Sequence, residues 1–306
     1  MKRLFFAAAL LLTANGNGFA ADFNTAFAEE PPVSAPEGLL AGGILSIYGG
    51  YLAYEKEEID IDDQDQGIVG ARGAYSLPLS SMFSAQFDLL GERNITGSNG
   101  NNDLTRGDYM GAIHLDARDP SSYLLGAFAG GGQSFDDGDN DGDSIPFWFA
   151  GLEGQAYLNN LTLGGQIGYV DSDDNYDETI SNAWFARAAT SYYFGEDTKL
   201  SGDLAFFTGD RANGNSSGSM DVISWGARLD HFFPDFPVGL MLAYNGFDYE
   251  GDAASNESDA PVVHEFRIGA SLLFGAGSIM ENDRRAAGAD LPPINRWIST
   301  SANEIE

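Results

Sequence analysis

The residues best suited to metal chemistry are four alternating aspartates: Asp137, Asp139, Asp141 and Asp143. Carboxylates at this spacing can converge on one hard cation, and Gly142 allows the sharp turn of a calcium loop. The bidentate Glu expected at the twelfth place is missing, because Trp148 stands there. We therefore expect either a weak Ca²⁺ site or a solvated acidic loop, and no other cofactor.

Hydrolytic chemistry would need a histidine beside a serine, with a third group that orients the pair. The chain has 3 His, and none of His114, His231 and His264 stands in a His-x-Ser pattern. Neither an H-E-x-x-H motif nor a phosphate-binding loop is present in the sequence. We expect no enzymatic activity, and the one catalytic candidate would be His264 with a serine of a neighbouring strand end.

The charge balance restricts the partners of the chain. It carries 15 Lys and Arg against 46 Asp and Glu, a formal net charge of -31. A phosphate-binding surface needs Lys and Arg, so no nucleic-acid partner is expected, and cations are the natural counter-partners. Cysteine is absent from the sequence, which excludes disulfides and thiolate metal sites.

The N-terminus carries a secretory signal. Lys2 and Arg3 precede an apolar run from Leu4 to Leu12, which is too short to span a bilayer. We expect a signal peptide over residues 1–20, with Ala28 as a later alternative cleavage point, and a Pro-rich periplasmic extension over 21–43. No later run reaches the roughly eighteen apolar residues of a transmembrane helix, so an exported chain would be either soluble or a barrel.

Between residues 44 and 274 the chain is a series of segments that alternate between apolar and polar side chains. Each is about ten to thirteen residues long, which matches a tilted strand crossing a membrane and exceeds the usual soluble strand. The twelve expected strands are 44–55, 67–77, 82–93, 106–117, 123–134, 145–157, 161–171, 182–194, 199–209, 221–233, 238–249 and 262–274.

The gaps between these segments alternate in length. Long polar gaps such as KEEIDIDDQDQ and NITGSNGNNDLT alternate with short gaps such as RDPSS and GEDT. The strands of outer-membrane barrels are connected in this way, by short turns on the periplasmic side and long loops on the outside. The sequence thus predicts an all-β fold, a transmembrane antiparallel up-and-down β-barrel of about twelve strands with long acidic extracellular loops.

The two faces of the expected strands differ in charge. Apolar residues such as Leu89, Ile113 and Ile167 share one parity without a charge among them, and the charged side chains take the other parity. A Lys or Arg facing the bilayer midplane would cost about 2–4 kcal/mol, so the charged face must turn inward. The expected pore lining is Arg72, Asp88, Arg106, Asp108, Asp116, Glu153, Arg187, Asp203, Arg228, Asp230, Glu265 and Arg267.

The last alternating segment carries a terminal pattern at four positions: Arg267, Gly269, Leu272 and Phe274. This pattern resembles the closing signal by which Gram-negative outer-membrane β-barrels are recognised for assembly. The resemblance covers residues 44–274 and implies a location in the outer membrane, contacts with its lipid and lipopolysaccharide, and recognition by the barrel assembly machinery. In most such proteins the aromatic residue is the last one, whereas here residues 275–306 follow.

The residues after Phe274 predict a periplasmic C-terminal tail over 275–306. Ser278 and Glu281 form a capping box, so we expect a short helix from Ile279 to Ala287. The alternative is that Trp297 and its neighbours fold back to close the barrel or dock on a periplasmic partner.

Two functions fit this architecture. The first is a porin-like channel for passive diffusion of small hydrophilic solutes or cations, because twelve strands enclose more space than eight and less than sixteen. The second is a non-conducting structural or surface-interaction barrel whose acidic loops bind divalent cations. The sequence leaves the solute and the oligomeric state open.

Overall fold

The computed structural model describes residues 38–55, 66–94, 106–136, 144–172, 180–213, 216–233, 236–251 and 262–303. These residues belong to one compact unit, Pro36–Glu306. The expected signal peptide, nearly all of the N-terminal extension and the four aspartates of the candidate calcium loop lie outside the described residues.

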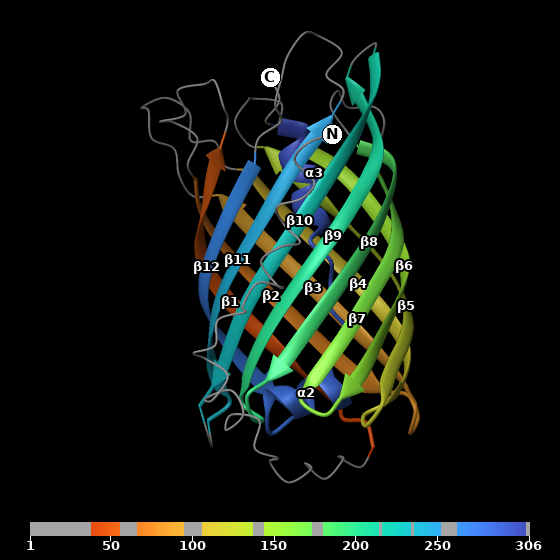
Figure 1. The fold of residues 1–306 in the computed structure, drawn as a ribbon, viewed down its shortest axis with the longest axis vertical. Coiled ribbons are helices and arrows are strands. Elements are labelled where there is room, and N and C mark those ends of the chain that lie inside the picture. The colour runs from red at the N-terminus through yellow and green to blue at the C-terminus, as the bar shows by residue number, and fades with distance from the viewer. Residues whose placement is uncertain are drawn as a thin grey trace, which may run out of the picture. The chain divides into compact units, whose positions relative to one another are not determined.

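Twelve antiparallel strands close into a barrel, as the alternation predicted (Figure 1). Each strand pairs with its neighbours in the sequence, and β1 closes the barrel on β12 with Gly43 opposite Phe274. The strands are β1 Gly42–Glu55, β2 Gln66–Pro78, β3 Phe83–Asn94, β4 Arg106–Asp119, β5 Tyr123–Asp136, β6 Ser144–Leu158, β7 Leu161–Ser172, β8 Ile180–Tyr193, β9 Thr198–Asn213, β10 Ser216–Phe232, β11 Val238–Gly251 and β12 Val262–Phe274.

One expected long loop differs from the structure. The sequence suggested a polar connection between the ninth and tenth strands, but β9 and β10 continue as a paired ladder as far as Asn213 opposite Ser216. Small and polar side chains do not prevent strand pairing, because the ladder is made by backbone groups. This hairpin therefore extends past the other strands at the end of the barrel opposite the short turns (Figure 1).

The outward face of the barrel is apolar. Leu89, Ile268 and Trp184 are 69%, 64% and 63% exposed, and the other residues assigned to the lipid side are likewise outward. Burying such a belt in hydrocarbon removes the cost of exposing it to water. The parity predicted from the alternation is therefore confirmed, and the barrel is a transmembrane one.

The inward and outward faces of β5 are difficult to assign from its sequence YLLGAFAGGGQSFD, and the structure explains why. Phe128 points inward and is buried, and Gly130 and Gly132 occupy the next two inward positions. A Cβ on these glycines would lie 2.5 Å from the ring of Phe149 and 2.6 Å from that of Phe147, their partners on β6. The glycines thus leave room for the aromatic rings of the neighbouring strand.

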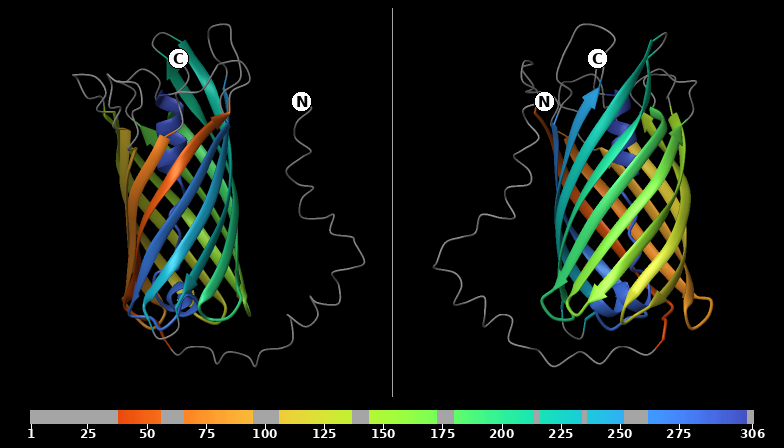
Figure 2. Two further views of the ribbon diagram at one scale, coloured as in Figure 1. Left: turned by 90° about the vertical axis from the view of Figure 1, so that its left-hand side faces the viewer. Right: turned by 45° about the vertical axis from the view of Figure 1, so that its right-hand side comes forward.

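The residues after β12 return into the barrel. The helix α2, Ile279–Arg285, lies at the end where the short turns join the strands, and α3, Ile294–Asn303, lies toward the opposite end (Figures 1 and 2). The capping box predicted at Ser278 is present, since the Ser278 hydroxyl accepts a hydrogen bond from the backbone N–H of Glu281 at 3.1 Å. The helix ends at Arg285, two residues earlier than expected.

The expectation of a tail outside the barrel is corrected by these contacts. Trp297, Ile298 and Leu291 are buried in the same apolar cluster as inward-facing strand residues. Both the apolar and the charged residues of the tail find partners on the inner wall of the barrel. We call residues 275–303 the plug and the inward-facing strand residues the lumen wall. None of the described helices is long and apolar enough to span a membrane.

Candidate functional site

The lumen wall is the place where charged groups collect. Of the twelve expected pore-lining residues, eleven have described side chains and all eleven face inward, where they are buried or border an internal cavity. The twelfth, Arg106, begins β4, and its side chain lies outside the described residues. The strands thus bring together the residues that the parity assigned to the lumen, while their lining of a conducting pore stays a prediction.

Many of these charges form ion pairs within the wall. Arg228 and Asp230, two positions apart on β10, form a pair at 2.7 Å. Arg118 and Asp116 on β4 do the same at 2.7 Å, and Arg267 and Glu265 on β12 also at 2.7 Å. Residues i and i+2 share a face of a strand, so this spacing satisfies buried charges locally.

A carboxylate of the plug is held by two arginines at mid-barrel. Asp290 accepts a hydrogen bond from Arg72 at 2.6 Å through one oxygen and from Arg187 at 2.7 Å through the other. Arg187 also donates to Asp203 at 3.2 Å and to the Gln166 side chain at 3.1 Å. Charge-assisted bonds of this kind are about twice as strong as neutral ones, so Asp290 is a strong polar anchor of the plug.

Three glutamines of the wall bind the main chain of the plug. Gln86 donates to the Ala289 carbonyl at 2.8 Å and accepts from the Ala289 N–H at 3.1 Å. Gln155 and Gln166 donate to the carbonyls of the flanking residues 288 and 290, at 2.7 Å and 2.5 Å respectively. Since an extended segment in a barrel lacks secondary-structure partners, these side chains supply the hydrogen bonds that its backbone needs.

The lower part of the plug closes the end with the short turns. Asp283 accepts hydrogen bonds from Lys199 and from the Tyr193 hydroxyl, both at 2.8 Å. Arg284 lies over the rings of Tyr157 and Tyr193, at 5.2 Å and 5.6 Å from their centroids. Burial lowers the pKa of the Arg284 guanidinium from its ordinary value, and the two tyrosines and Asp283 oppose that shift.

The upper part of the plug is held by aromatic packing around Trp297 and by ion pairs of Arg296. Trp297 is fully buried, with its ring 5.3 Å from that of Phe185 and 5.2 Å from that of Phe207. Its indole N–H donates to the Ser224 hydroxyl at 3.2 Å. Next to it, Arg296 forms ion pairs with Glu265, at 3.0 Å, and with Glu92.

A polar cavity remains beside the plug. Its volume is about 220 Å³, and its lining includes five basic side chains, Arg72, Arg187, Lys199, Arg228 and Arg267. The acidic side chains in the lining are Asp203 of the wall and Asp283 and Asp290 of the plug. Although Asp290 lies deep inside the barrel, 46% of its side chain is exposed, because it faces this cavity.

The three histidines lie in separate places. His114 is buried in the lumen wall, 2.7 Å from a Glu153 oxygen and 3.4 Å from an Asp88 oxygen. His231 shares a hydrogen bond of 2.8 Å with Thr198, and His264, the one catalytic candidate, shares one of 2.9 Å with the Tyr244 hydroxyl. The rings of Tyr244 and His264 form a stacked aromatic pair on the neighbouring strands β11 and β12.

Several residues of the site were missed in the sequence. Gln86, Gln155 and Gln166 stand at inward parity, and this position was the signal that could have identified them. Asp290 and Arg296 carried no such signal, because they follow the last strand and their partners are set by the path of the plug.

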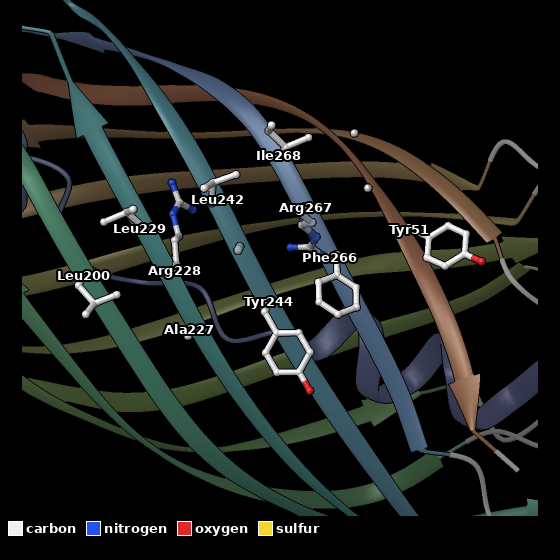
Figure 3. Close-up of a pocket in the computed structure, with 13 residues that line it drawn as sticks. Tyr51, Leu200, Ala227, Arg228, Leu229, Leu242, Tyr244, Phe266, Arg267 and Ile268 are labelled. Carbon is white, nitrogen blue, oxygen red and sulfur yellow. The ribbon is translucent and has the colours of Figure 1, made fainter. Parts of the chain in front are cut away.

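The outer wall also has a groove. It is about 660 Å³ and lies over β1 and β9–β12, between apolar side chains such as Leu242, Phe266 and Ile268 (Figure 3). Small residues including Gly49, Gly50 and Ala227 form its floor. Because this surface belongs to the lipid-facing belt, its natural contact is the acyl chains of the membrane.

Among the residues that the structure describes, no three His, Asp or Glu side chains converge in a metal-binding arrangement. The Ca²⁺ site of Asp137 to Asp143 stays a prediction. The assembly signal of Arg267, Gly269, Leu272 and Phe274 also stays a prediction. Of these residues, Leu272 and Phe274 lie on the lipid face of β12.

No protein-family model matches the sequence, and no curated protein matches it either. The structure is similar to that of the COG4313 outer membrane channel from Pseudomonas putida F1, with a TM-score of 0.57 and 12% identity, over 80% of this chain and 100% of that one. The chain folds as an outer-membrane β-barrel. The apolar belt and the closed strand order place it in the outer membrane of a Gram-negative bacterium.

Two further solved structures are similar at lower scores. The KdgM porin in complex with disordered oligogalacturonate has a TM-score of 0.39 and 11% identity, over 75% of this chain and 99% of that one. LpxR from Salmonella typhimurium has a TM-score of 0.42 and 9% identity, over 76% of this chain and 100% of that one.

Proposed function

We propose that this barrel is a porin-like channel for small hydrophilic solutes, which the plug holds closed. The observation that carries the proposal is the polar path along the plug. Asp283 and Asp290 contact wall cations beside a cavity of about 220 Å³, and wall glutamines bind the plug backbone. A segment held by hydrogen bonds and ion pairs can exchange them for water, and its departure would leave a charged, hydrated passage.

The size of the barrel supports this function. Twelve strands leave a lumen wider than the side chains of the wall can fill. In this protein the plug occupies the remaining space. Removing that segment would open a passage of intermediate width. Small solutes would then move through it down their concentration gradient.

A second function is favoured by the aromatic end of the plug. Trp297 and the rings around it form a dry core, which is typical of a permanently closed interior. On this alternative, the barrel is a structural or surface-interaction protein, and its acidic loops bind divalent cations. Lipopolysaccharide and the barrel assembly machinery are proposed partners on either alternative.

Single-channel conductance of the refolded full-length protein in a planar bilayer tests the proposal. We expect rare openings for the unmodified chain and frequent discrete steps for the double variant Trp297→Ala with Asp290→Asn, because both anchors of the plug are lost. The control is Trp184→Ala, which removes an outward, lipid-facing indole. Folded, heat-modifiable barrels that give no steps in any variant would favour the closed structural alternative.

A further inference from the structure

We propose that Arg72 and Arg187 form a binding site for the carboxylate of a small anionic solute, which Asp290 occupies while the barrel is closed. This inference rests on the proposed channel function and assigns a substrate class to it. The sequence indicated cations as counter-partners because of the net charge of -31, and many of the acids that give this charge lie outside the described residues. Beside Asp290, the lining of the cavity holds five basic side chains against three acidic ones.

The two arginines come from opposite walls. Arg72 lies on β2 and Arg187 on β8, and these strands are six positions apart in either direction around the closed barrel. Their guanidinium groups nevertheless meet at one carboxylate, with distances of 2.6 Å and 2.7 Å to its two oxygens. The site is therefore built from two opposite sides of the lumen wall.

The charge of this region depends on the plug. The basic lining of the cavity belongs entirely to the wall, whereas two of its three acidic side chains, Asp283 and Asp290, belong to the plug. Besides Asp290, Arg72 has Asp88 at 3.8 Å and Arg187 has Asp203 at 3.2 Å, and both of these carboxylates belong to the wall. When the plug leaves, each arginine loses its shortest ion pair, so the open site would attract an anion in its place.

The neighbouring groups define the ligand further. Gln166 donates to the main-chain carbonyl of Asp290 at 2.5 Å, and Gln86 binds both main-chain polar groups of Ala289. The site therefore accommodates a carboxylate with an amide close to it. Access to the site is provided by the cavity, to which the Asp290 side chain is exposed. A carboxylate-bearing solute with a hydrogen-bonding amide or hydroxyl matches this set of donors and acceptors.

Displacement of the plug by such a solute can be measured with one cysteine. The chain has no native cysteine, and Ala289 is buried in the plug against Leu124 and Tyr157. In the full-length Ala289→Cys protein, the rate of thiol labelling by a water-soluble maleimide reports how often the plug leaves the wall. The probes are N-acetyl-aspartate N-methylamide and its neutral isostere, N-acetyl-asparagine N-methylamide, at equal ionic strength.

We expect the aspartate probe to accelerate labelling by about tenfold relative to the asparagine probe, because a charge-assisted contact to two arginines is worth at least that factor. The double substitution Arg72→Gln with Asp290→Asn keeps the net charge and should abolish the difference. Arg228→Gln, which removes another cation of the same cavity, should preserve it. Equal labelling with both probes in a protein whose fold is verified by heat modifiability would overturn the site.

The ion selectivity of the opened channel separates this inference from the proposed function. In a KCl gradient, the double variant Trp297→Ala with Asp290→Asn, in which the arginine pair is intact and its carboxylate is gone, should give a reversal potential that favours chloride. A conducting channel with no preference or a cation preference would contradict the anion site and leave the channel standing. Absence of conductance together with equal labelling by both probes would reject both.

Discussion

The two anchors of the plug use different physics. At mid-barrel, Asp290 is bound by two arginines beside a water-accessible cavity, and its contacts are ionic. Toward the loop end, Trp297 is fully buried among aromatic rings, and its contacts are mainly apolar. Ionic contacts respond to salt and to competing ions, whereas aromatic burial does not. The plug can therefore loosen at its middle while its end remains docked.

The largest effect should come from the aromatic anchor. Trp297→Ala removes a buried indole, for which the expected loss of docking free energy is about 3–5 kcal/mol. Hydrogen exchange of the plug amides in the reconstituted protein should rise accordingly, and more near α3 than near α2. Trp184→Ala on the lipid face serves as the control and should leave the plug protected. Unchanged protection in Trp297→Ala would mean that the aromatic contacts do not hold the plug.

The ionic anchor should contribute less, because its carboxylate is partly exposed. Asp290→Asn is expected to weaken docking by about 1–3 kcal/mol, since two charge-assisted bonds become neutral ones. Labelling of Ala289→Cys should increase in this background and lose most of its dependence on KCl between 0.05 and about 1 M. If labelling of the Ala289→Cys protein with Asp290 intact is already independent of the KCl concentration, then ionic contacts of Asp290 do not hold the plug.

The glutamine contacts separate the two anchors further. Gln155→Ala removes one hydrogen bond to the Gly288 carbonyl, which is expected to cost about 1 kcal/mol. Exchange of amides 286–290 should rise by about fivefold while those of α3 stay protected. A uniform rise along the whole plug would show that it docks as one unit, and the contrast between middle and end would then fail.

The smallest effect should come from Ser224, which accepts the hydrogen bond of the Trp297 indole at 3.2 Å. Ser224→Ala is expected to cost about 0.5–1.5 kcal/mol, because the buried N–H is left without this acceptor. The emission of Trp297 would report the change once the outward indoles, Trp148, Trp184 and Trp225, are replaced by Phe. A loss as large as that of Trp297→Ala would show that the hydrogen bond, and not ring burial, holds the end of the plug.

The strands and their faces could be predicted because a strand alternates with period two, so one pattern determines both its existence and its outward side. Arg72, Asp203 and Glu265 were assigned to the interior on parity alone, and each lies there. The β5 strand was difficult because its glycines carry no side chain to alternate, and their role depends on Phe147 and Phe149 of the next strand.

By itself, the sequence determined the barrel, its apolar belt and the inward position of the charges, since these follow from local periodicity and from the cost of a charge in hydrocarbon. Only the tertiary structure decided where residues 275–303 lie and which charges meet. Arg72 and Arg187 are far apart in the sequence and lie on opposite strands, so their meeting at Asp290 depends on the number of strands that close the barrel. Contacts between side chains on opposite sides of a lumen follow no periodic pattern in the sequence. They depend on how the strands close into a barrel, and not on the spacing of the residues along the chain.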